Sequence, residues 1–170
     1  MRYDRIAIGL HWVVGLAVLG QFALGWWMLE IPKGGAGERA WWFNAHKSIG
    51  MTIAVLVILR ILWRLSHAAP ALALPQWQRL AASASHRGLY ACMLVLPLSG
   101  YLGSSFSGYP VKYFGFVLPA WASSWPAAKN LMSAVHETAA WTLCALLLLH
   151  VAAALWHLVR ADGVFRRMWI

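Results

Sequence analysis

The stretch from Ser133 to Arg160 constrains the fold of this chain more than any other segment. Between Glu137 and Arg160 it runs for 22 residues without a formal charge, long enough for a helix to cross the hydrocarbon core of a bilayer. His136 and His150 lie 14 residues apart in it, close to four helical turns, so both project from nearly one face. Their separation along the helix axis is about 21 Å. Such a helix could hold two cofactors at different depths if other helices supply partners.

The composition agrees with a membrane protein. Hydrophobic residues make up 61% of the 170 residues and charged residues only 11%, which is outside the usual range of soluble domains. The length fits a single domain over residues 1–170. The first apolar run, 6–29, is too long for the hydrophobic part of a signal peptide and ends at no small-residue cleavage site. We therefore expect it to remain as the first helix.

Apolar runs predict an all-α protein with four transmembrane helices in one bundle. The expected helices cover about 6–29, 46–65, 88–106 and 133–160. The second run has few uncharged residues, so we expect Arg60 and Arg64 at its end to extend toward the membrane interface. The connection at 107–132 contains three prolines and several aromatic residues, and we expect an ordered cap there.

The distribution of charge predicts the orientation. The N-terminus, the second connection and the C-terminus together carry a net charge of +7, whereas the other two connections carry +2. Because the cytoplasmic loops of membrane proteins are enriched in Lys and Arg, both termini are predicted to lie in the cytoplasm. The net charge of +9 is explained by this topology and by contact with membrane lipid, so it indicates no nucleic-acid partner.

With this orientation, histidines fall at two matched depths. His46 and His136 open their helices on the outer side and are level with each other. On the inner side, the candidates for pairing with His11 are His150, His157 and His86. Spacing favours His150, which lies deepest. Ionisable residues inside a membrane are costly and usually functional. A lone histidine is as often a neutral structural residue, but that explanation does not account for four at two levels on three helices.

Paired imidazoles from facing helices favour b-type haem with two histidine ligands. Zinc and iron–sulfur sites use cysteine or carboxylate ligands, whereas the spans hold two separated cysteines, Cys92 and Cys144, and no paired acids. Two axial protein ligands leave no open position on the iron, which favours electron transfer over oxygen activation. Two haems at different depths would form an electron path across the membrane.

Several segments resemble the bacterial cytochrome b561 family, namely LHW at 10–12, HKSIG at 46–50, PLSG at 97–100, HE at 136–137 and LHVAAALWH at 149–157. The resemblance covers essentially the whole chain. It implies a four-helix protein of the bacterial inner membrane, with a bundle that encloses two b haems and exchanges electrons with the quinone pool. It also implies the iron ligands, with His46 paired with His136 and His11 paired with His150. One branch of the family is similar to superoxide oxidase, which passes electrons from superoxide on the outer face to ubiquinone.

Other residues are candidates for the electron donor and acceptor sites. Lys47 adjoins a predicted ligand, and with the other outer cations it would concentrate an anionic donor such as superoxide, although ordinary solvation also explains it. The candidates for a quinone pocket near the inner haem are Trp12, His86, Arg87 and His157. Interfacial anchoring is an equal alternative for them. Glu137 would orient an imidazole or favour the N-terminus of the fourth helix, and we prefer the second role.

These patterns predict a di-haem b oxidoreductase that takes electrons from superoxide, or another small donor, and reduces ubiquinone. The first alternative is a haem-bearing subunit that serves a partner dehydrogenase or a periplasmic cytochrome. The second is a haem-free transporter or scaffold, which would need charged residues along a substrate path, and the spans show none in their middle. A homodimer and a complex with a partner redox protein are both compatible with the sequence.

Overall fold

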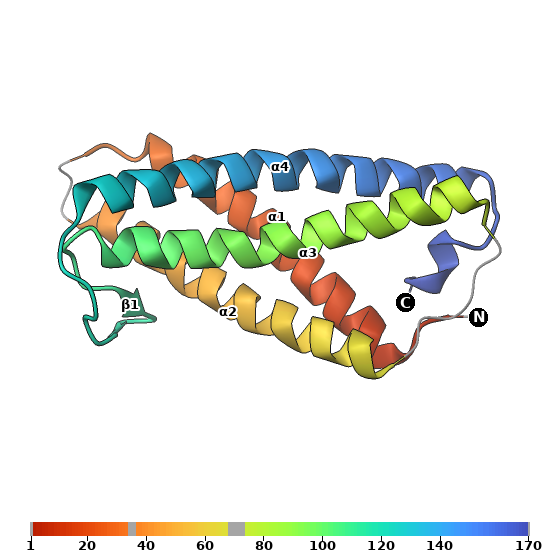
Figure 1. The fold of residues 1–170 in the computed structure, drawn as a ribbon, viewed down its shortest axis with the longest axis horizontal. Helices are drawn as coiled ribbons and strands as arrows, with labels where there is room; N and C mark the ends of the chain where they lie inside the picture. Colours follow the sequence, from red (N-terminus) through yellow and green to blue (C-terminus); the bar gives the residue numbers. More distant parts are fainter. Residues whose placement is uncertain (1, 34–36, 68–73, 170) are drawn as a thin grey trace.

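A computed structural model describes residues 2–33, 37–67 and 74–169. These residues form four long α-helices, a two-stranded hairpin and a short 3-10 helix (Figure 1). The elements are α1 (Arg5–Glu30), α2 (Glu38–Ser66), α3 (Gln76–Ser105), β1 (Lys112–Tyr113), β2 (Phe116–Val117), α4 (Pro126–Val159) and η1 (Phe165–Arg167). Each of the four α-helices is long and apolar enough to cross a membrane. The fold is therefore a bundle of four transmembrane helices.

The helix starts follow local signals. Asp4 caps α1 by accepting a hydrogen bond of 2.8 Å from the backbone N–H of Ala7, and this bond lowers the pKa of the Asp4 carboxyl. Pro126 occupies the first turn of α4, where its fixed φ suits a helix and its missing N–H costs nothing. The helices α2 and α3 begin at Glu38 and Gln76, earlier than the apolar runs, because helical hydrogen bonding continues into the polar sequence before each run.

The start of α4 corrects the role preferred for Glu137. The apolar run suggested a helix from about residue 133, so that Glu137 would lie near its N-terminus. In the structure α4 begins at Pro126, and Glu137 is exposed three turns further along. A carboxylate interacts with the helix dipole only within the first turn. The expectation that Glu137 favours the N-terminus of the helix is therefore wrong.

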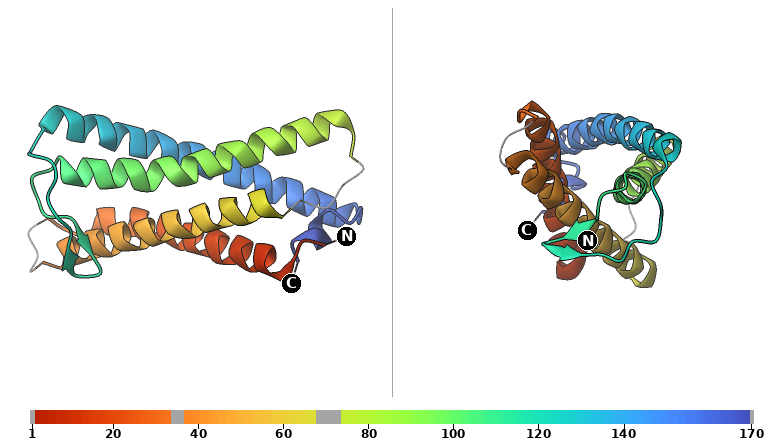
Figure 2. Two further views of the ribbon diagram at one scale, coloured as in Figure 1. Left: turned by 60° about the horizontal axis from the view of Figure 1, so that its bottom comes forward. Right: turned by 90° about the vertical axis from the view of Figure 1, so that its left-hand side faces the viewer.

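The helices pack as two pairs. α1 packs against α2 and α3 against α4, and α2 also contacts α3 (Figure 2). Among the described residues, no Cα atom of α4 lies within 8 Å of a Cα atom of α1 or α2. Only side chains therefore bridge these helices. Both termini lie at one end of the bundle, and the hairpin lies at the other (Figure 1).

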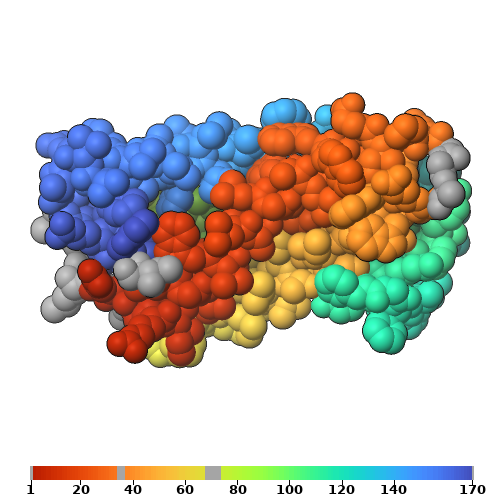
Figure 3. Space-filling view, turned by 180° about the vertical axis from the view of Figure 1, so that it is seen from behind, coloured from red at the N-terminus to blue at the C-terminus, as the bar shows by residue number. Residues whose placement is uncertain are grey.

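The buried core is small and lies midway along the bundle. Val57 and Leu143 are 0% and 2% exposed, and the cluster around them contains Val14, Val18, Ile53, Leu89 and Met93. Many other large apolar side chains point outward, as expected for a surface in contact with lipid. On the face seen in Figure 3, α1 runs diagonally between α4 and α2. This apolar core lies between the two ends of the bundle, where the polar side chains of the helices contact each other.

The connection between α3 and α4 is ordered, as predicted. Its strands β1 and β2 pair antiparallel. The backbone N–H of Phe114 donates to the hydroxyl of Ser48 at 2.9 Å, and the hydroxyls of Thr52 and Tyr113 lie 3.1 Å apart. Ser48 is only 1% exposed, so this polar contact is buried. The hairpin is thus fixed to α2 within two residues of His46.

Candidate functional site

Two pairs of histidines bridge the helices that do not pack directly. His46 of α2 faces His136 of α4 with ring centroids 6.3 Å apart, and we call these two residues the hairpin-end pair. His11 of α1 faces His150 of α4 with centroids 6.1 Å apart, and we call these two the termini-end pair. The four histidines singled out in the sequence thus form two separate pairs in the structure, and the partners in each pair are those that the depths favoured.

The geometry of both pairs fits two imidazoles on one haem iron. A first-row metal binds an imidazole nitrogen at about 2.0–2.1 Å, and that nitrogen lies about 1.1 Å from the ring centroid. Two imidazoles on opposite sides of one iron therefore have centroids about 6.3 Å apart. The observed separations are 6.3 and 6.1 Å. In the described part of the chain no Cα atom of α1 or α2 lies within 8 Å of a Cα atom of α4, so side chains alone occupy the space around each pair between these helices.

The backbone of α3 orients His136. Its Nδ1 lies 2.9 Å from the carbonyl oxygen of Leu96 and 3.2 Å from the hydroxyl of Ser99. A carbonyl can only accept, so Nδ1 carries the proton and Nε2 is left with its lone pair. Gly100 lets α3 approach, since a Cβ atom there would lie 3.3 Å from the His136 ring. A ligating histidine usually donates its other N–H in this way.

His46 has a different environment. Its Nδ1 is buried and has no hydrogen-bond partner among the described residues, and the same holds for Oε1 of Gln21. The Gln21 amide donates to the carbonyl oxygen of His46 at 2.8 Å, so this glutamine already contacts the backbone of the histidine. A Cβ at Gly25 would lie 3.5 Å from the His46 ring. The groups that contact the hairpin-end pair are thus neutral, while the cation Lys47 follows His46 in the chain, and in the described part of the chain Nδ1 of His46 has no hydrogen-bond partner.

The termini-end pair has charged and ionisable neighbours. Nη2 of Arg60 lies 2.8 Å from Nδ1 of His11. The ring of His86 is 5.6 Å from that of His150, and Trp12 is 5.6 Å from His11. A centroid separation of 5.6 Å is shorter than about 6.3 Å, so His11 matches the geometry of an iron ligand opposite His150 better than His86 does.

The remaining candidates for a quinone pocket are dispersed. The indole N–H of Trp12 donates to the carbonyl of Met168 at 2.7 Å, which ties α1 to the C-terminal segment. Arg87 donates to Ser83 on its own helix. Nδ1 of His157 lies 2.6 Å from a carboxylate oxygen of Asp162, and this hydrogen bond lowers the pKa of Asp162. The structure therefore brings His86 and Trp12 to the termini-end pair, while Arg87 and His157 make their contacts elsewhere.

The cations at the hairpin end differ in what they lie next to. Lys47 is partly buried beside His46. Arg39 donates to the carbonyl oxygens of Leu29 and Ile31 and so braces the connection between α1 and α2. The other cations assigned to this side by sequence are Lys33, Lys112 and Lys129.

Sequence reasoning missed three residues that contact the histidine pairs, namely Gln21, Arg60 and Ser99. Gln21 had a usable signal, because it is the only amide side chain in the first span, where His11 is the only ionisable residue. Arg60 was missed because the sequence led us to expect its side chain at the membrane interface and not beside a histidine. Ser99 lies in the PLSG segment that carries the family resemblance, but nothing pointed to a contact with a histidine, because serines in membrane helices commonly bond to their own backbone, as Ser99 also does to Val95 at 2.7 Å.

Comparison with known proteins gives a consistent result over nearly the full chain. Residues 2–170 match the family described as prokaryotic cytochrome b561. Cytochrome b561 homolog 2 of Escherichia coli (strain K12) is 34% identical over 175 residues, covering 98% of this chain and 90% of that protein. Cytochrome b561 homolog 1 of the same strain is 30% identical, covering 98% and 96%. A probable superoxide oxidase, CybB, of Yersinia pestis is 28% identical, covering 98% and 95%.

Proposed function

The chain belongs to the prokaryotic cytochrome b561 family, and on this premise we propose that it holds two b haems and passes electrons from superoxide to ubiquinone. Membership makes it a multi-pass bacterial membrane protein that binds haem b and transfers electrons. The observation that supports two haems is the presence of two histidine pairs at the bis-histidine separation, at opposite ends of the bundle. The name of the Yersinia pestis relative supports superoxide as the donor.

The proposed reaction balances with two one-electron steps. Each b haem, when bound, supplies a one-electron Fe(III)/Fe(II) couple. Two superoxide anions give up one electron each and become two molecules of O2. One ubiquinone takes both electrons together with two protons and becomes ubiquinol. The protein therefore has to admit an anion at one end of the bundle and deliver protons to a quinone at the other.

Superoxide is assigned to the hairpin end. The positive-inside bias puts the termini in the cytoplasm and therefore the hairpin on the outer face. Lys47 is the cation next in sequence to a proposed iron ligand, and it lies partly buried at that end. A cation in a cleft of low dielectric raises the local concentration of an anion. Lys47 would thus steer the donor to the haem held by His46 and His136.

Ubiquinone is assigned to the termini end. His86 and Trp12 adjoin the termini-end pair, and a neutral histidine can donate a hydrogen bond to a quinone oxygen and pass on a proton. Arg87 and His157 remain candidates from the sequence, with contacts to Ser83 and Asp162 and none to the termini-end pair in the described part of the chain.

Reduced-minus-oxidised spectra with a haem-to-protein ratio test the proposal. We expect a b-type spectrum with two haems per chain, fast reduction by enzymatically generated superoxide, and oxidation by a soluble ubiquinone analogue. Lys47→Ala should slow the superoxide step and weaken its dependence on salt. A folded preparation without haem would instead support a transporter or scaffold. Haems that superoxide does not reduce, but a purified redox protein does, would favour the subunit serving a partner.

A further inference from the structure

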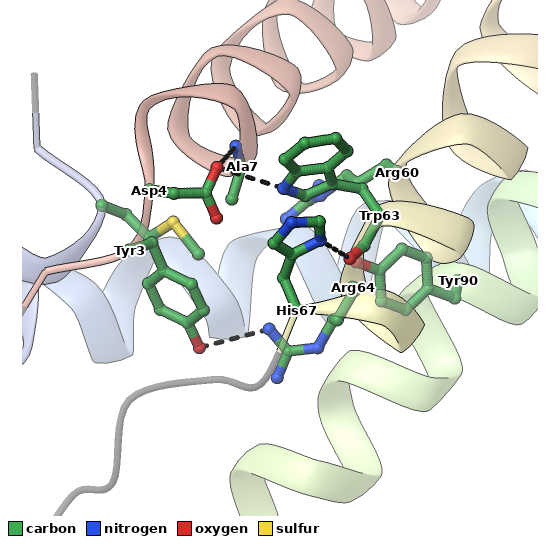
Figure 4. A pocket seen from close by; sticks show the side chains of 9 residues that line it. Tyr3, Asp4, Ala7, Arg60, Trp63, Arg64, His67 and Tyr90 are labelled. Atoms are coloured by element: carbon green, nitrogen blue, oxygen red, sulfur yellow. Dashed lines mark hydrogen bonds between the residues drawn. The ribbon is translucent and has the colours of Figure 1, made fainter.

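Arg60 lies on a helix long and apolar enough to span the membrane, and it has no acidic partner among the residues that the structure describes. It lies in the last two turns of α2, is partly buried, and stacks over the ring of Tyr90 at 5.4 Å. It lines a small cavity that also contains Tyr3, Asp4 and Trp63 (Figure 4). Among the described residues, which include every Asp and Glu of the chain, the only ion pair within 4.0 Å joins His157 and Asp162.

Asp4 does not neutralise Arg60, although both line the same cavity. The Asp4 carboxylate accepts from the backbone N–H of Ala7 at 2.8 Å and from the indole N–H of Trp63 at 3.1 Å. It therefore caps α1 and braces α2, and it lies outside ion-pair distance of Arg60. Charged side chains within membrane spans are costly and almost always pair with an opposite charge or a backbone carbonyl. In the described residues Arg60 has no carboxylate partner, and the acceptor that the protein supplies is the neutral Nδ1 of His11.

The present partner of Arg60 is incompatible with iron binding. A guanidinium only donates hydrogen bonds, so the 2.8 Å contact requires Nδ1 of His11 to accept and Nε2 to carry the proton. A neutral histidine that binds a metal through one nitrogen carries the proton on the other. Whichever nitrogen binds iron, Nδ1 of His11 can then no longer accept from Arg60. The guanidinium must turn to another acceptor when His11 becomes a ligand.

We propose that Arg60 binds a propionate carboxylate of the haem held by His11 and His150. This inference rests on the proposed haem at the termini-end pair. A b haem carries two carboxylates at one edge, and the planar fork of an arginine matches a carboxylate with two parallel hydrogen bonds. Arg60 is already within hydrogen-bond distance of one proposed ligand. The haem would therefore bring the missing counter-charge into the span.

The charge of Arg60 also gives electron transfer a direction. Reduction adds one negative charge to the haem, so a fixed cation nearby favours the reduced state and raises the reduction potential. The hairpin-end pair has the neutral Leu96 carbonyl and Ser99 as its contacts, and its nearby cation, Lys47, follows His46 in the chain. Arg60, in contrast, is in hydrogen-bond contact with a proposed ligand, so it raises the potential of the termini-end haem relative to the same haem without this charge. This shift favours electron flow from the hairpin end toward the termini.

Redox titration of Arg60→Met in the purified holoprotein tests the inference. We expect the termini-end haem to become harder to reduce, with at least a tenfold change in the equilibrium for sharing an electron between the haems, equal to 59 mV for a one-electron couple. Selective loss of that haem would support the same carboxylate site. The matched control is Arg64→Met, because Arg64 lies one turn away, is exposed and donates to the hydroxyl of Tyr3. Arg64 lines the same cavity but, within the residues that the structure describes, contacts no proposed ligand, so this control should shift the potential much less than Arg60→Met.

A second variant covers the case in which Arg60→Met does not fold. Arg60→Lys keeps the charge but not the fork, so the potential should stay close to that of the wild type. Haem loss to excess apomyoglobin should become at least threefold faster. Unchanged potential and haem content in Arg60→Met, or unchanged haem loss in Arg60→Lys, would overturn the inference. Absence of haem from the wild type would instead refute the proposed function.

Discussion

Each end of the bundle has its own pair of histidines, and the two pairs differ in the groups that contact them. At the hairpin end, His136 donates to a backbone carbonyl and His46 lies beside the neutral Gln21. At the termini end, a guanidinium contacts His11, and a third histidine adjoins His150. The distances within the pairs differ by only 0.2 Å, as the centroid separations of 6.3 and 6.1 Å show. The ends are thus nearly alike in the separation of their rings and differ in the groups that contact those rings, which include a guanidinium at the termini end.

If each pair binds a haem, as proposed, this difference would give the two haems different reduction potentials. Both pairs would supply the same two axial imidazoles, so a difference in potential would come from hydrogen bonds to the ligands and from nearby charge. A carbonyl that accepts from an imidazole makes the ligand more electron-rich and favours ferric iron. A cation near the haem favours ferrous iron. The direction of electron transfer between the proposed haems would therefore depend on the residues next to the iron ligands.

The largest expected effect comes from removing one ligand at each end. His136→Ala should lose the hairpin-end haem and His150→Ala the termini-end haem, so the haem-to-protein ratio falls from two to one in each. The potential of the remaining haem then belongs to a single site. His67→Ala is the control, since His67 is exposed and stacks on Trp63 at 3.9 Å. If either ligand variant kept both haems, the assignment of that pair would be wrong.

A smaller effect should follow from changing Gln21. The unpaired Nδ1 of His46 and the unpaired Oε1 of Gln21 are a donor and an acceptor on contacting residues, and a change of side-chain rotamer can join them. Gln21→Leu removes the acceptor, so we expect the hairpin-end haem to become easier to reduce by about 20–40 mV, a two- to fivefold change in the equilibrium constant. Gln21→Glu should shift the potential in the opposite direction.

Potentiometric titration of both Gln21 variants distinguishes this role from simple packing. The termini-end haem serves as the internal reference and should keep its potential. Equal shifts of both haems, or shifts of one sign in both variants, would contradict the expected hydrogen bond.

The glycines that face the hairpin-end pair should differ in their tolerance of a methyl group. A Cβ at Gly100 would lie 3.3 Å from the His136 ring, tighter than most contacts, whereas a Cβ at Gly25 would lie at 3.5 Å from His46. Gly100→Ala should therefore displace His136 and destabilise the protein by about 1 kcal/mol or more. Gly25→Ala should be close to the wild type. Thermal unfolding of both variants in detergent, with the haem spectrum as a second readout, checks the contrast. Equal tolerance would mean that α3 does not set the position of His136.

The smallest effect concerns pH and the end of α4. The hydrogen bond from His157 lowers the pKa of Asp162 below its ordinary value of about 3.8. A lowered carboxyl pKa contributes stability that is complete above that value and is lost as the pH falls through the folded-state pKa. Asp162→Asn should therefore lower the melting temperature slightly at neutral pH, and the difference should narrow below pH 3.8. Melting curves from pH 3 to 7 would show this, and a difference that persists at low pH would point to another cause.

The sequence predicted the membrane spans and the levels of the histidines well, but it did not predict where the helices end. The four spans and the levels of His46 and His136 were readable, because the length of an uncharged run and the position of a residue along a helix give its depth. The helix ends were not, since α2, α3 and α4 continue into polar sequence outside the apolar runs. That error misplaced Glu137 at a helix terminus.

The sequence by itself determined that this chain crosses the membrane as four helices, and that histidines lie at two depths. Only the tertiary structure decided which side chains meet at each depth. Arg60 and Arg64 looked alike as basic residues at the end of one span, yet Arg60 contacts His11 while Arg64 is exposed. In a membrane bundle the inner and outer faces are both apolar, so the pattern of hydrophobic residues does not reveal how each helix is rotated. Helix packing sets that rotation and thereby the charge beside each pair of histidines.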